Sequence, residues 1–228
     1  KTKCVLFRPQ GSAEAASGNI TLGPYHITIE KSVKLLGVIF TEHMSWNEHI
    51  KTLLTKLSKA AGVLSRCCHI LPPHVKRTLY YALLNSHLYY CASVWGNTTL
   101  TNLHKLTLIQ KKALWSIENA PFLEHTDPLF RKYRIIKSDK IYTHKLLIMY
   151  KSAQLDKLDK FLDLVSLKET IALYPFRYKP PYEIPFSRTH YGTERVKHTM
   201  PFTLNIYYAR DIDILTLTKQ EILDLCVA

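Results

Sequence analysis

The sequence predicts an α+β fold that is mostly helical. Three short runs near the start are rich in β-forming residues and are separated by Gly and Pro: Cys4–Phe7, Ile27–Ile29 and Val33–Phe40. From about residue 44, apolar residues recur at helical spacing. After Tyr174, five prolines exclude long helices, so loop or extended chain is expected until Thr218. We therefore expect three parts: a small β segment at 1–43, a helical bundle at 44–119, and a helical and irregular extension at 120–228.

The β segment is expected to form the edge of a small antiparallel sheet. Within Val33–Phe40 both alternating faces carry apolar side chains, and Lys34 is the plainly polar residue. Apolar residues on both faces are typical of a strand that is covered on both sides. We therefore expect this strand to be buried on both faces.

The first expected helix begins at the pair Ser45 and Glu48. A Ser hydroxyl and a Glu carboxylate three residues later can satisfy the free amides of a helix start, which is the capping-box pattern. The helix should continue to about Arg66. One stripe of it is apolar, comprising Ile50, Leu53, Leu54, Leu57, Ala61 and Leu64. The opposite side carries Lys51, Thr55, Lys59 and Arg66, so one face should pack and the other should be positively charged.

Further helices follow with similar spacing of apolar residues. They are expected at about His74–Tyr90, Asn102–Ile117, Asp139–Ser152 and Leu158–Val165. Pro72 and Pro73 separate the first helix from the second, because proline ends one helix and is tolerated in the first turn of the next. Three amphipathic helices with short connections are sufficient for a compact bundle.

Positive charge is concentrated in one part of the chain. The net charge is +13, and residues 31–112 contain eleven Lys or Arg against two Glu. Such a surface favours a polyanionic partner, because each phosphate that a protein neutralises releases condensed counterions. A plain solvated basic surface would have the same composition. Charge alone therefore leaves nucleic-acid binding and a solvated surface both open.

Composition also bears on the compartment. The longest stretch without Lys, Arg, Asp or Glu, Thr78–Leu103, is interrupted by Asn, Ser and His, so we expect a buried helix there and no membrane span. The five cysteines are odd in number and are spaced like neither a disulfide framework nor a zinc site. We expect an intracellular protein, cytoplasmic or nuclear.

A series of short motifs occurs in a recognisable order along the chain. They are K-T-K-x-x-x-F at 1–7, L-G-V at 36–38, W-x-x-H-I at 46–50, L-Y-x-x-L-L at 79–84, Y-x-x-x-x-W-G at 90–96, Q-K-K-A-L at 110–114, H-T-D-P-L-F at 125–130 and P-F-S-R-T-H-Y-G at 185–192. This order resembles the end of the palm, the thumb and the downstream region of non-LTR retrotransposon reverse transcriptases, of the LINE or jockey-like type found in arthropods. Each motif is weak alone, since Leu, Tyr and Trp at helical spacing usually form a core. Their order carries the resemblance, which covers about the first 205 residues.

The resemblance implies roles for the expected parts. Residues 1–43 would be the palm end with a primer-grip-like hairpin, and 44–119 would be the thumb. The partners would be an RNA or DNA template–primer and the fingers and palm of a longer parent protein, of which this chain would be a fragment. The nucleic-acid-binding candidates are Lys34, Leu36, Gly37, Lys51, Lys59, Arg66, Lys111 and Lys112.

Catalytic residues of a polymerase are not expected in this chain. Reverse transcriptases bind two divalent metal ions through carboxylates that include a Y-x-D-D turn, and no Y-x-D-D occurs here. The one D-x-D, at Asp211 and Asp213, is interpreted as a solvated pair. Cys67 and Cys68 are interpreted as helix-end packing, because zinc ligands need intervening residues. We expect no catalytic residue, metal site, cofactor or small-molecule ligand in the chain itself, and no polymerase activity of the chain alone. For the parent polymerase we expect Mg²⁺.

Two alternatives remain open at the level of sequence. In the first alternative, the chain is a stand-alone basic helical module that binds nucleic acid. In the second, it is an inactive remnant of a decayed element that keeps its fold. The coding sequence immediately upstream would discriminate among all three interpretations, because it either encodes an intact palm or does not.

Overall fold

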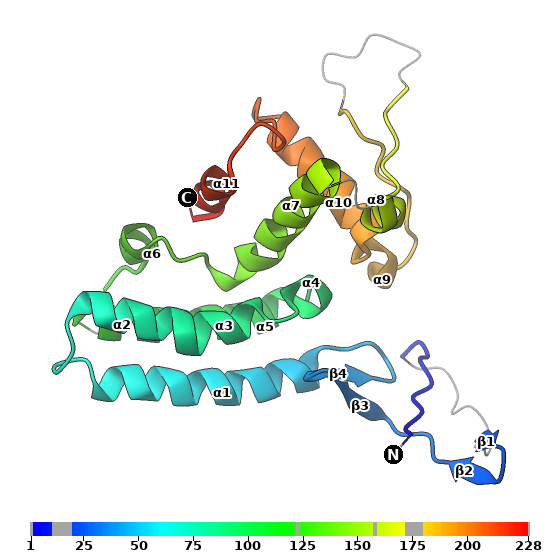
Figure 1. The fold of residues 1–228 in the computed structure, drawn as a ribbon, viewed down its shortest axis with the longest axis horizontal. Helices are drawn as coiled ribbons and strands as arrows, with labels where there is room; N and C mark the ends of the chain where they lie inside the picture. The colour runs from blue at the N-terminus through cyan, green and yellow to red at the C-terminus, as the bar shows by residue number, and fades with distance from the viewer. Residues whose placement is uncertain (1, 11–19, 122–123, 157–158, 172–179, 228) are drawn as a thin grey trace. The chain divides into compact units, whose positions relative to one another are not determined.

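The computed structural model in Figure 1 describes residues 2–10, 20–121, 124–156, 159–171 and 180–227. It is mostly helical, with two small antiparallel sheets near the N-terminus, which confirms the predicted α+β class. The chain forms two compact units. Unit 1 comprises Lys1–Cys91 and Thr98–Glu124, and unit 2 comprises Ala92–Asn97 and His125–Ala228.

Unit 1 begins with two hairpins. Their strands are β1 (Ile20–Leu22), β2 (Tyr25–Ile27), β3 (Ser32–Leu35) and β4 (Val38–Thr41). In the second hairpin Ser32 pairs with Thr41 and Leu35 pairs with Val38, so Leu36 and Gly37 form a two-residue turn. The expected strand at Cys4–Phe7 is reduced to one bridge, between Cys4 and Ile29.

The prediction of one continuous strand at Val33–Phe40 was wrong. Leu36 and Gly37 have φ values of 46° and 84°, and two successive residues with positive φ are typical of a type I′ turn, which reverses the chain. The expected burial of both faces was also wrong, since Leu35 is 58% exposed and Leu36 is 80% exposed, whereas Val38 is 3% exposed. The apolar residues in this stretch therefore mark a hairpin tip and one buried anchor.

Helix α1 (Asn47–Arg66) starts without the expected capping box. Trp46 occupies the cap position, and its indole offers no acceptor for a helix amide. The Ser45 hydroxyl lies one residue earlier and accepts the Asn47 N–H at 3.4 Å. The Ser45 backbone is instead held by Thr41, whose hydroxyl accepts the Ser45 N–H at 2.9 Å and donates to the Ser45 carbonyl at 3.0 Å. The helix start is thus fixed by the end of β4.

The remaining helices of unit 1 are α2 (Pro73–Tyr80), the π-helical segment η1 (Tyr81–Asn85), α3 (Ser86–Tyr89) and α5 (Leu100–Glu118). Helix α1 packs along α5 and against η1. Leu57, Leu84 and Leu114 are fully buried in the core between these helices. Buried Tyr80 accepts a hydrogen bond of 2.9 Å from Gln110 Nε2, so this buried polar pair is satisfied.

Unit 2 is also helical. Its helices are α4 (Ala92–Trp95), α6 (Asp127–Tyr133), α7 (Ser138–Asp156), α8 (Asp159–Val165), α9 (His190–Thr193), α10 (Val196–Tyr208) and α11 (Lys219–Val227). Helix α7 contacts α4, α8 and α11, and α10 contacts α8 and α9. In the part of the chain that the structure describes, no helix is long and apolar enough to span a bilayer.

The expectation of an irregular tail up to Thr218 was wrong for α10. This helix contains Pro201, which cannot donate to the carbonyl four residues earlier. Burial outweighs that loss, because Met200, Leu204 and Tyr207 recur at helical spacing and are all buried in unit 2.

Candidate nucleic-acid interface

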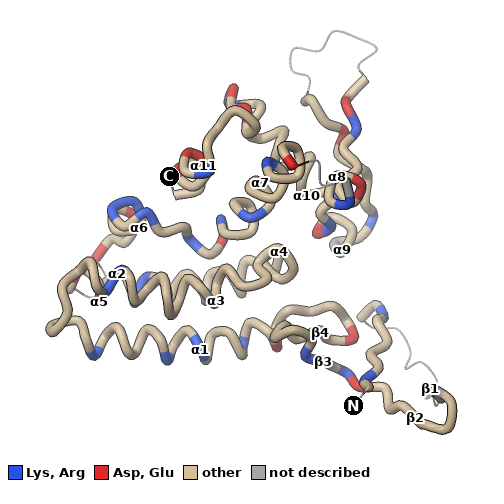
Figure 2. Tube along the Cα trace, in the orientation of Figure 1, with Lys and Arg blue, Asp and Glu red and all other residues tan. Residues whose placement is uncertain are grey.

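The solvent face of α1 carries a row of positive charge. Lys51, Lys59 and Arg66 are exposed, while the buried residues of the helix lie on its other side. From Lys51 to Arg66 the row covers 15 residue-to-residue steps, or about 22 Å at 1.5 Å per step. Figure 2 shows basic residues along the whole of α1. Lys56, which was not among the predicted site residues, is exposed on the same helix, and Glu48 is the single acidic residue of α1.

The turn between β3 and β4 is held against the end of α3. The Tyr90 hydroxyl donates a hydrogen bond of 2.5 Å to the Leu36 carbonyl. A Cβ atom at Gly37 would lie 3.4 Å from the Tyr90 ring, and φ at Gly37 is 84°, so a side chain there would be strained. Leu36 itself adopts φ of 46° with its side chain 80% exposed. A non-glycine residue with positive φ at an exposed tip is uncommon and often marks a functional position.

A pocket of about 350 Å³ opens beside this turn. It is lined by Leu36, Gly37, His49, Thr52, Leu53, Lys56, His87 and Tyr90. The turn and the first half of α1 therefore share one cavity within unit 1. The predicted residues Leu36 and Gly37 are brought next to basic Lys56, while Lys34 is exposed on β3 just before the turn.

His49 is a neutral residue in this pocket. Burial, together with the positive charge of Lys56, lowers the pKa of His49 below its usual value. Its Nδ1 accepts the Ile39 N–H at 3.4 Å, which requires an unprotonated Nδ1. The electrostatic effect of the neighbouring Cys91 raises the pKa of Tyr90, and desolvation of Tyr90 and a hydrogen bond to Cys91 raise it further. The Tyr90 hydroxyl therefore keeps the proton that it donates to the Leu36 carbonyl. Lys56 brings a positive charge to the lining of this pocket.

Lys111 and Lys112 lie on α5 and are separated by about 100° around the helix. Lys112 is exposed and lines a second pocket, of about 500 Å³, together with Gly62 and Ser65 of α1. Lys111 is half-buried. The structure therefore brings Lys112 beside α1 but does not place both lysines on one surface.

Lys76 belongs to the basic cluster in the sequence but not to its surface. Its side chain is fully buried, and its Nζ donates to the Cys68 carbonyl at 3.0 Å, the Ser116 carbonyl at 3.0 Å and Asn119 Oδ1 at 2.9 Å. These acceptors lie at the C-terminal ends of α1 and α5, where helix carbonyls lack partners and favour a cation. Lys76 is therefore a structural residue of the helical bundle of unit 1.

The carboxylates do not gather into a metal site in the described part of the chain, where no group of three His, Cys, Asp or Glu side chains could hold an ion. Asp211 is exposed, and Asp213 Oδ1 accepts the Leu215 N–H at 2.9 Å in a local turn. Cys67 and Cys68 are half-buried free cysteines at the end of α1.

Comparison with known proteins finds no protein-family model, no curated protein and no solved structure that matches this chain.

Proposed function

We propose that this chain is the thumb and adjoining connection of a non-LTR, LINE-type reverse transcriptase and that it holds a template–primer duplex through phosphate contacts. The observation that carries the proposal is the basic face of α1, which adjoins an exposed hairpin turn in the same unit. In polymerases of the family that the motifs resemble, a hairpin of this kind supports the primer strand. The polymerase carboxylates would be supplied by the palm of the parent protein.

The geometry of unit 1 suits a phosphate backbone. Double-stranded DNA carries one phosphate per about 3.4 Å of each strand, so a helix face of about 22 Å faces several phosphates at once. Lys51, Lys59 and Arg66 are exposed on that face, and contacts of such cations with phosphates carry no sequence information. Binding should therefore be salt-dependent and nearly independent of sequence.

The test is the salt dependence of binding to a 20-base-pair RNA–DNA hybrid of arbitrary sequence, measured by fluorescence anisotropy. Replacing Lys51, Lys59 and Arg66 together by Gln should weaken binding to every sequence alike. The slope of log K against log salt should flatten by up to about three units, near 0.9 for each lost contact.

A matched control removes the same charge from unit 2. Lys140, Lys160 and Lys219 are exposed there, and their replacement by Gln should change the slope much less than the α1 variant does. Equal slopes for the two triple variants would mean that net charge, and not the face of α1, determines binding. A salt-independent affinity of the unmodified chain would contradict the proposal altogether.

A further inference from the structure

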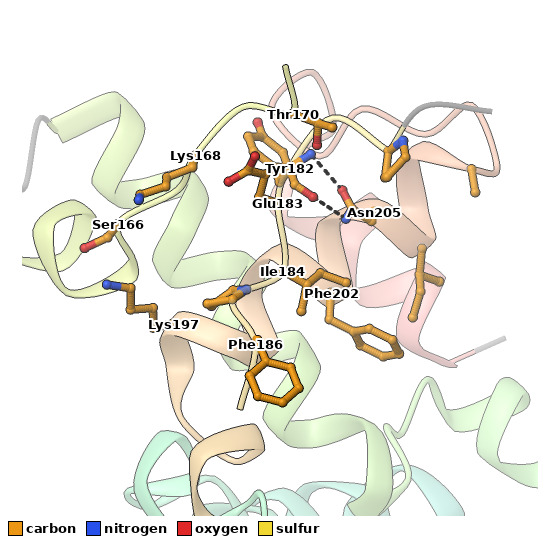
Figure 3. A pocket seen from close by; sticks show the side chains of 14 residues that line it. Ser166, Lys168, Thr170, Tyr182, Glu183, Ile184, Phe186, Lys197, Phe202 and Asn205 are labelled. Carbon is orange, nitrogen blue, oxygen red and sulfur yellow. Dashed lines mark hydrogen bonds between the residues drawn. The ribbon is translucent and has the colours of Figure 1, made fainter. Parts of the chain in front are cut away.

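A pocket of about 800 Å³ lies in unit 2. It lies between α10 and two extended segments, at 166–170 and 180–186. Figure 3 shows it from close by, with Lys168 and Lys197 on one flank and Phe186 and Phe202 below. Its volume is in the range of small-ligand sites, which is about 300–1,000 Å³.

The wall of the pocket is fixed by backbone hydrogen bonds. The Thr170 N–H donates to the Pro181 carbonyl at 3.0 Å, and the Glu183 N–H donates to the Lys168 carbonyl at 2.9 Å, so the two extended segments pair. Asn205 of α10 then holds Tyr182 from the other side. Its Oδ1 accepts the Tyr182 N–H at 3.1 Å, and its Nδ2 donates to the Tyr182 carbonyl at 2.8 Å (Figure 3).

Asn205 fixes the backbone of the pocket wall at Tyr182. Asn205 is 7% exposed and satisfies both polar groups of the Tyr182 backbone, as a neighbouring strand would. Ile184 and Phe186 follow in the same segment, two and four residues after Tyr182, and both line the pocket. The wall as far as Glu183 is preorganised, and a preorganised wall loses little conformational entropy when a ligand binds.

The lining combines exposed aromatic rings with positive charge. Phe186 is 92% exposed and Phe202 is 51% exposed, a costly exposure for two large apolar side chains in one pocket. Lys168 and Lys197 are also exposed, and among the described residues no carboxylate lies within ion-pair distance of either. Glu183 is the single acidic residue of the lining.

We propose that this pocket binds a segment of single-stranded nucleic acid, with a base stacked on Phe186 and the adjoining phosphates beside Lys168 and Lys197. An apolar peptide would leave the two ammonium groups without counter-charge, whereas a nucleotide supplies both a π face and an anion. Aromatic rings beside backbone-tracking cations are the general means of binding single strands without sequence preference. This site is distinct from the duplex-binding face proposed for α1, and it stands on unit 2 alone.

The experiment uses the full chain and a 12-nucleotide oligothymidylate with a fluorescent label. Phe186→Ala should raise the dissociation constant at least about fivefold, because stacking of one base is lost. Lys168→Gln combined with Lys197→Gln should weaken binding and lower its salt dependence. Since Phe186 is almost fully exposed, its truncation removes few packing contacts, and circular dichroism should show an unchanged fold.

Three controls isolate the site. Tyr208→Ala truncates an exposed aromatic of α10 outside the pocket and should bind the oligonucleotide as the unmodified chain does. An abasic 12-mer has the same phosphates without bases, so its weaker binding should not respond to Phe186→Ala. The α1 variant with Lys51, Lys59 and Arg66 replaced by Gln should retain single-strand binding at the pocket, which separates this proposal from the duplex-binding one.

The proposal is overturned if Phe186→Ala leaves the affinity for oligothymidylate unchanged, or if the abasic strand binds as tightly as the one with bases. Effective competition by oligoglutamate at equal charge would also overturn it, because the pocket would then be a general anion site. Quenching of Phe186→Trp fluorescence by oligothymidylate, but not by the abasic strand, would place the base on this residue.

Discussion

Lys76 connects the C-terminal ends of two helices from a fully buried position. Replacing it by Met keeps the length of the side chain but leaves the Cys68 and Ser116 carbonyls and Asn119 Oδ1 without their shared donor. Unsatisfied buried acceptors cost about 1–3 kcal/mol each, partly offset because a buried charge is removed. We expect Lys76→Met to lower the free energy of unfolding by at least about 2 kcal/mol, measured by urea denaturation. Lys105→Met, on the exposed side of α5, should change it by less than about 0.5 kcal/mol, and equal effects would contradict the role of Lys76.

The sequence alone could place some candidate residues but not others. The 3.6-residue spacing of Lys51, Lys59 and Arg66 against a regular apolar stripe was sufficient to predict their exposure. No local pattern distinguishes Lys76 from them, because its burial depends on two helix ends that are distant in sequence. Asn205 was also missed, since an amide that pairs with the backbone of Tyr182 has no signature of its own.

Helix α7 contains a buried histidine, His144. Burial, and to a smaller extent the charge of Lys145, lowers the pKa of His144 from 6.5 to about 4. The unfolded chain therefore binds a proton between pH 6.5 and 4 that the folded chain does not. Above pH 6.5, His144 does not change the free energy of unfolding. As the pH falls from 6.5 to about 4, His144 lowers the free energy of unfolding, by at most about 3 kcal/mol.

We expect His144→Gln to flatten the pH dependence of the free energy of unfolding of the full chain between pH 6.5 and 4, measured by denaturation at a series of pH values. His104→Gln, at an exposed position of α5, should keep the pH dependence of the unmodified chain. Part of the dependence should survive in the His144 variant, because the pKa of His49 in unit 1 is lowered as well. An NMR titration of the His144 ring with a midpoint near 6.5 would contradict this prediction.

Secondary structure was predictable where the pattern was long and regular. Helices α1, α5 and α7 lie close to their expected ranges, because each repeats its apolar spacing over several turns. The turn at Leu36 was missed because a β-rich run signals strand, and leucine rarely adopts positive φ. Helix α10 was missed because proline normally argues against a helix interior, whereas here burial of one face outweighs it.

Buried apolar side chains are unevenly distributed along the described part of the chain. In the described residues from 2 to 43, Val38 is the one apolar side chain in the buried core, and the strands of both hairpins are only three or four residues long. The helices of unit 1, by contrast, bury a continuous set of leucines. Isolated two-stranded hairpins are marginal in water, so the N-terminal segment should open locally far more easily than the bundle.

Hydrogen exchange of the full chain tests this difference. Among the helices and strands of unit 1, we expect the amides of β1 and β2 to exchange fastest, because local opening of a hairpin exposes little apolar surface. The amides within Leu53–Leu88 should exchange slowest, because opening of the bundle exposes its core. Mass spectrometry after peptic digestion gives the required resolution. Addition of a primed RNA–DNA duplex should slow exchange around the Leu36 turn if the hairpin contacts the primer, with peptides of α11 as the control. Amides of Val38 and Ile39 that are already as slow as those of Leu57 in the free chain would show that the hairpin is part of the rigid core, and would contradict this prediction.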